Sequence, residues 1–181
     1  MIGALTYDEY VEAVAREAAD IVDVIRRGDP ASRVPTCPAW NLTDLAAHIG
    51  AFCVWSHVLC EGTGRPKPPF AEQPAEAGPA TADWLDGLLG PLVDELRATP
   101  PDTEVWTWVT VDKSARFIAR RAAHELSVHR YDAQLAVGEP EPIDAPLAAD
   151  GIDEMFLMRN DAETAAPHVG SGETMHLHTA E

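Results

Sequence analysis

The sequence has few basic residues. Its 181 residues include 13 lysines and arginines against 30 aspartates and glutamates, which gives a formal net charge of −17 at pH 7. Nucleic acids and anionic membrane surfaces are bound through basic patches. The charge balance therefore argues against both kinds of partner.

The sequence also lacks a long apolar run, a signal peptide and a regular set of cysteines. No segment has the ~20 consecutive apolar residues of a membrane-spanning helix. The first residues, Met1 to Glu9, contain no basic region ahead of an apolar one. The three cysteines, Cys37, Cys53 and Cys60, are an odd number without tight spacing. Reduced thiols are typical of the cytoplasm, so we expect a cytoplasmic protein.

Apolar residues recur at intervals of three and four in four segments, a pattern typical of amphipathic helices. We therefore predict a mainly α protein built as a four-helix bundle, with helices at about residues 6–27, 41–60, 82–98 and 113–137. Thr6 and Glu9 form a capping-box pattern at the first helix, and Thr81 can cap the third. Gly90 and Pro91 should kink or divide that third helix. The Pro- and Gly-rich residues 62–80 are predicted to form an exposed crossover.

The pattern changes after residue 139. Residues 147–159 can form another helix, and residues 173–179 alternate like a β-strand. A single strand needs partners, so this part resembles the start of a small, incomplete α/β unit, in either a fragment or a chain with a short C-terminal part. We predict two domains, a metal-binding bundle over residues 1–139 and this partial α/β segment over residues 140–181.

The fourth helix carries a polar face. Glu125 and His129 are four residues apart, so they lie one above the other and can hold one metal ion from one side. Arg121 lies one turn before Glu125, and Asp132 lies three residues after His129. Such a face is costly to bury unless something binds there. A solvated face with ion pairs between turns is the alternative.

His48, on the second predicted helix, can supply a third ligand. Asp44 lies one turn earlier and could orient its ring, as carboxylates often do for metal-bound imidazoles. The alternatives are that His48 is a structural histidine and that Asp44 only suits the start of its helix.

Two separated groups of residues form one combined pattern: Cys37-Pro-Ala-Trp40 with Asp44-Leu45 and His48, and His124-Glu125 with His129-Arg130 and Asp132. Together they resemble the N-terminal metal-binding domain of mycothiol-dependent maleylpyruvate isomerases, part of the DinB/YfiT-like superfamily of thiol-dependent metalloenzymes. The resemblance covers about residues 6–138. It implies a DinB-like four-helix bundle, a divalent metal, usually zinc, on His48, Glu125 and His129, and mycothiol as cosubstrate in an actinobacterial cytoplasm.

The chemistry of these residues agrees with that implication. Three protein ligands leave one coordination position of zinc open, which is typical of a catalytic site. A thiol bound there loses its proton and becomes a nucleophile. The thiolate can add to a cis double bond next to a carbonyl. Rotation about the resulting single bond and elimination of the thiolate then complete the isomerisation. For an anionic substrate, helical spacing makes Arg121 the candidate catalytic anchor, and adjacency makes Arg130 a second one. Pairing of Arg121 with Glu125 is the alternative role.

We therefore expect an enzyme, either a mycothiol-dependent isomerase or a mycothiol S-transferase. Two other hypotheses stay open. The same centre can activate water and hydrolyse thiol conjugates, or the bundle can be a non-enzymatic metal-binding or regulatory module.

Overall fold

The computed structural model describes residues 5–60 and 79–161, together with residues 172 and 174. Its helices are α1 (Tyr7–Arg27), α2 (Leu42–Cys60), α3 (Pro79–Ala98), α4 (Ala115–Val137) and α5 (Ala145–Asn160). Extended pairing within these residues is limited to two isolated bridges, Arg33 with Asn41 and Glu104 with Ser114. The protein is therefore a mainly α helical bundle, as predicted.

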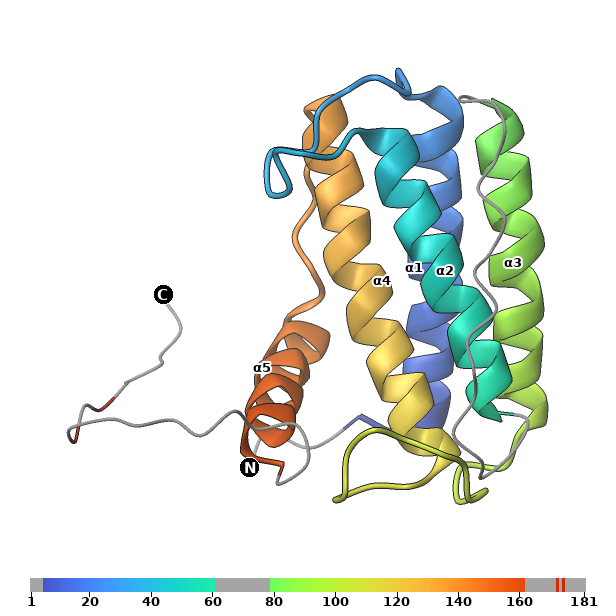
Figure 1. Ribbon diagram of the computed structural model, residues 1–181, viewed down its shortest axis with the longest axis vertical. Coiled ribbons are helices and arrows are strands. Elements are labelled where there is room, and N and C mark those ends of the chain that lie inside the picture. The colour runs from blue at the N-terminus through green and yellow to red at the C-terminus, as the bar shows by residue number, and fades with distance from the viewer. Residues whose placement is uncertain (1–4, 61–78, 162–171, 173, 175–181) are drawn as a thin grey trace.

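The first four helices form the bundle, and Figure 1 shows them side by side with α5 against the flank of α4. Around the bundle α1 packs on α3 and α4, and α2 also packs on α3 and α4. The apolar stripes meet inside; Ile21, Leu45, Leu85, Leu89 and Leu126 are fully buried. Because α2 packs against α4, a side chain of α2 can face the polar face of α4.

The predicted helix ends are confirmed at α1 and α4. Thr6 and Glu9 form the reciprocal capping box: the Thr6 N–H donates to the Glu9 carboxylate at 2.7 Å, and the Glu9 N–H donates to Thr6 Oγ1 at 3.3 Å. At the end of α4, Gly138 has φ 82°. Glycine adopts this left-handed conformation without steric penalty, and it terminates the helix there.

The predictions for α3 are partly wrong. The helix begins at Pro79, so Thr81 lies inside it and is buried instead of capping it. The helix also continues through Pro91 without being divided. Burial of Leu89, Leu92 and Leu96 on its inner face offsets the hydrogen bond that proline removes. Most of the predicted crossover, residues 62–78, lies outside the described residues.

The predicted helix over residues 147–159 is present as α5, and it is fastened to the bundle. Asp150 accepts hydrogen bonds from the Tyr10 hydroxyl at 2.8 Å and from Arg120 Nε at 2.9 Å. The strand predicted over residues 173–179 lies outside the described residues, except residue 174. The domain boundary at residues 139 and 140 stays a prediction.

Within the described part of the chain, no helix combines the length and the apolar character that crossing a membrane requires.

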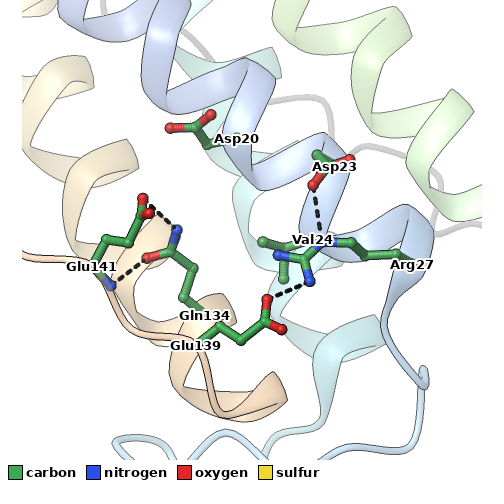
Figure 2. Close-up of a pocket in the computed structure, with 7 residues that line it drawn as sticks. All are labelled: Asp20, Asp23, Val24, Arg27, Gln134, Glu139 and Glu141. Atoms are coloured by element: carbon green, nitrogen blue, oxygen red, sulfur yellow. Dashed lines mark hydrogen bonds and ion pairs between the residues drawn. The ribbon is translucent and has the colours of Figure 1, made fainter.

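A hollow of about 210 Å³ lies between α1 and the segment that follows α4 (Figure 2). Arg27 donates to Asp23 at 2.9 Å and to Glu139 at 2.5 Å, while the backbone N–H of Glu141 donates to Gln134 at 2.9 Å. The bond to Glu139 ties the chain after α4 to the end of α1, and the bond to Gln134 holds the same segment against α4. The hollow contains none of the predicted site residues.

Candidate metal centre

His48, Glu125 and His129 lie together, and we call these three residues the candidate metal centre. His48 comes from α2, and the other two come from α4. His48 Nε2 lies 3.1 Å from Glu125 Oε1, and His129 Nε2 lies 3.2 Å from the same oxygen. One ligand atom from each residue lies within 4.8 Å of the others. Two ring nitrogens and one carboxylate oxygen therefore face one point.

Packing of α2 against α4 places His48. Leu45 and Ile49, three residues before and one residue after His48, are fully buried and hold this part of the helix in the bundle. The Trp40 ring, just before α2, lies against the His48 ring with 5.0 Å between centroids. The rings of His48 and His129 meet edge to face at 4.8 Å. His48 is thus held between an aromatic wall and its partner histidine.

A chain of side chains orients His129. Its Nδ1 lies 2.9 Å from Asp132 Oδ2, and Thr36 Oγ1 donates to Asp132 Oδ1 at 2.6 Å. When His129 Nδ1 donates a hydrogen bond to Asp132, the ring is oriented so that Nε2 faces Glu125 and the position of an ion. Sequence spacing placed Asp132 on this face but missed Thr36, because no periodicity links a Pro-rich loop to a helix 96 residues away.

Arg121 fixes the other oxygen of Glu125. Its Nη2 donates to Glu125 Oε2 at 2.9 Å, and its Nη1 pairs with Glu154 of α5. The predicted ion pair with Glu125 is therefore present. Because both terminal nitrogens bond to carboxylates, an anionic substrate would have to displace one of them. The role of Arg121 as a substrate anchor stays a prediction.

Arg130, the second candidate anchor, is buried and bonded on several sides. Its Nε donates to Glu17 at 2.8 Å, and its Nη1 donates to Gln134 at 2.8 Å and to the Glu141 carbonyl at 2.6 Å. Only 4% of its surface is exposed. These contacts give it a structural role between α1, α4 and the segment after α4.

Asp44 and His124 form their hydrogen bonds outside the candidate metal centre. Asp44 accepts from the Asn41 N–H at 3.0 Å, and its own N–H donates to Asn41 Oδ1 at 2.9 Å. Asp44 therefore takes the helix-capping role and not the role of orienting His48. His124 lies 2.8 Å from Asp150 and is buried outside the candidate metal centre. Its position about 100° around the helix from Glu125 explains this separation.

The charges of the centre depend on these contacts. Burial raises the pKa of Glu125, but hydrogen bonds from His129 and His48 and the charge of Arg121 outweigh it, and the pKa lies well below its usual range. Burial lowers the pKa of His129, but the hydrogen bonds to Asp132 and Glu125 raise it by more than burial lowers it. The resulting pKa is about 9. Without metal the pair is a carboxylate and an imidazolium. A bound ion would replace the imidazolium proton on Nε2.

The family described as the mycothiol maleylpyruvate isomerase N-terminal domain matches residues 11–134. The chain belongs to this family. The matched region extends from α1 into the last turn of α4 and includes His48, Glu125 and His129. No curated protein and no solved structure matches the chain.

For the metal-free protein we predict that the free energy of unfolding falls between pH 7 and 9. Because the pKa of His129 is raised from 6.5 to about 9, the folded state binds its proton more tightly than the unfolded state. That stabilisation is complete below pH 6.5 and is lost as the pH rises through 9. At 1.36 kcal/mol per pKa unit, the loss is on the order of 3 kcal/mol.

Urea unfolding in EDTA at several values between pH 6.5 and 9 measures this loss. His129→Gln is the matched variant, because its amide can still donate a hydrogen bond but does not titrate. The decline in stability should be smaller in this variant. Equal declines in the two proteins would show that His129 does not hold the proton.

Proposed function

We propose that the protein is a divalent-metal- and mycothiol-dependent enzyme, either a cis–trans isomerase of the maleylpyruvate type or a mycothiol S-transferase. The convergence of His48, Glu125 and His129, in a chain that belongs to this family, is the observation that carries the proposal. Two imidazole nitrogens and a carboxylate oxygen suit zinc, which we propose as the metal. We also propose the cytoplasm of a mycothiol-producing actinobacterium as the setting.

The donor set fits a catalytic metal. A bound zinc would keep a coordination position open and lower the pKa of a thiol placed there. Asp132 Oδ2 lies 2.9 Å from His129 Nδ1 and can accept a hydrogen bond from it, so that Nε2 can act as the ligand. Arg121 occupies Oε2 of Glu125 and leaves Oε1 for the ion. Each ligand from α4 therefore has a neighbour that sets its orientation.

Exposure indicates the side from which ligands approach. The His48 side chain is 38% exposed, compared with 20% for Glu125 and 13% for His129. Thiol and substrate would therefore reach the centre beside α2, along the wall that Trp40 forms against His48. A small anionic substrate meets the centre on this side.

The isomerase reaction consumes no thiol. The mycothiol thiolate adds to a carbon of a cis double bond conjugated to a carbonyl, and the electron pair moves to the carbonyl oxygen. Rotation about the new single bond follows. Elimination then restores the double bond in the trans form and releases the thiolate. In the S-transferase reaction the carbon–sulfur bond remains, the enolate takes up a proton, and the product is a thioether of mycothiol.

We predict turnover only when zinc and mycothiol are both present. Purified protein, with and without zinc, is incubated with maleylpyruvate in the presence and absence of mycothiol. The assay measures the loss of the cis isomer and the loss of free thiol. Glu125→Gln should lower zinc affinity and turnover by at least about tenfold, since it removes a charged ligand. Glu12→Gln, which changes an exposed carboxylate in α1, is the matched control and should leave both unchanged.

The same assay separates the alternative functions. Release of thiol from a mycothiol conjugate, without free mycothiol, would favour a metal-dependent hydrolase with an activated water. Stoichiometric zinc without turnover on any thiol substrate would favour a non-enzymatic metal-binding or regulatory module.

Arg121→Lys tests the two roles of that residue. Lysine keeps the charge but cannot bond to two carboxylates through a planar fork. Because the contacts of Arg121 support a role in holding Glu125, we expect zinc affinity to fall about tenfold with the KM for the anionic substrate unchanged. Zinc titration and steady-state kinetics on the same preparation measure both quantities. A raised KM with full zinc affinity would instead assign Arg121 to the substrate.

A further inference from the structure

A cavity of about 440 Å³ lies between α4 and α5. Figure 1 shows α5 beside α4, with α2 on the other side of α4 in this view. Most of the cavity wall is apolar, with Val128 from α4 and Leu147, Ile152, Met155 and Met158 from α5. Its volume lies within the ~300–1,000 Å³ that small-molecule pockets occupy.

The exposed apolar surface of the described residues concentrates around this cavity. Among the described residues, the exposed large hydrophobic side chains are Val111, Val128, Ile152 and Met155. The last three line the cavity, with exposed fractions of 48%, 46% and 43%. Contiguous exposed apolar residues mark binding sites more often than isolated ones do. Methionine adds a flexible side chain that can adapt to a ligand.

Glu154, a residue of the cavity wall, has a buried oxygen without a hydrogen-bond partner among the described residues. Glu154 is 1% exposed and lines the cavity. One of its oxygens pairs with Arg121, but Oε1 has no hydrogen-bond partner among the described residues. A buried acceptor without a hydrogen-bond partner destabilises the folded state. A ligand that donates a hydrogen bond to Oε1 would remove that penalty.

The charges beside the cavity disfavour an anion. Arg121 is paired with Glu125 and Glu154, and Arg120 is paired with Asp150 through two bonds of 2.9 and 3.1 Å. Both cations are therefore neutralised by carboxylates. An anionic ligand would gain no free positive charge here and would lie close to Glu154.

We propose that the cavity between α4 and α5 binds a neutral, largely apolar small molecule that carries one N–H or O–H group, which donates to Glu154. The apolar body fills the space between Val128 and the inner face of α5. The cavity contains none of the three metal-centre residues, so this site does not rest on the proposed enzymatic function.

N-Phenyl-1-naphthylamine is a suitable probe, because it is neutral, apolar, fluorescent in apolar surroundings and carries one N–H. We expect saturable binding of one probe per chain in EDTA, so that the result is independent of metal. Ala148→Phe, at an exposed position that lines the cavity, should fill the space and weaken binding at least tenfold. Ala145→Phe, exposed on the same helix but outside the cavity wall, is the matched control and should bind as the wild type does.

A second comparison tests the hydrogen bond. The N-methylated probe lacks the donor, and it should bind the wild-type protein at least fivefold more weakly than the parent probe. In Glu154→Met, which removes the acceptor, the two probes should bind alike. Circular dichroism establishes that each variant is folded, and the wild-type comparison of the two probes stands even if Glu154→Met does not fold.

Absence of saturable binding, or equal weakening by Ala148→Phe and Ala145→Phe, would overturn the site. Equal affinity of the two probes for the wild-type protein would overturn the role of Glu154. None of these results depends on zinc uptake, so failure here and failure of the proposed function are distinguishable.

Discussion

The carboxylate of Glu125 is the group on which the rest of the candidate metal centre depends. Its Oε1 faces both imidazoles, and its Oε2 is held by Arg121. Burial alone would raise its pKa, so these three partners keep it ionised. The centre therefore holds a negative charge at a fixed point inside the bundle wall. A metal ion is a natural partner for that charge, because it can replace the proton shared with His129.

Helix α4 presents two different faces to its neighbours. Toward α2 it offers Glu125 and His129, and toward α5 it borders the apolar cavity through Val128. Arg121 lies between the faces and pairs with a carboxylate on each side, Glu125 and Glu154. This one guanidinium thus connects α5 to the metal-binding face. The four-helix core provides the rigid frame on which both faces are built.

Much of this arrangement was predictable from the sequence, because it follows from helical periodicity. The spacing of Glu125 and His129 predicted their shared face, and the family resemblance joined His48 to them as one ligand set. The contacts of Thr36 with Asp132 and of Glu154 with Arg121 were not predictable, since they join elements far apart in the chain. Local rules also failed where packing dominates. Pro91 does not divide α3, because the flanking leucines are buried on one continuous face.

X-ray absorption at the zinc edge tests the metal centre most directly. For protein reconstituted with one zinc per chain, we expect only nitrogen and oxygen ligands, at about 2.0–2.2 Å, with the scattering pattern of two imidazoles. Addition of mycothiol should bring one sulfur to about 2.3 Å. Cys53 should not contribute, because burial raises the pKa of its thiol to about 12. A zinc–sulfur distance before any thiol is added, or failure to retain stoichiometric zinc, would contradict a centre formed by His48, Glu125 and His129.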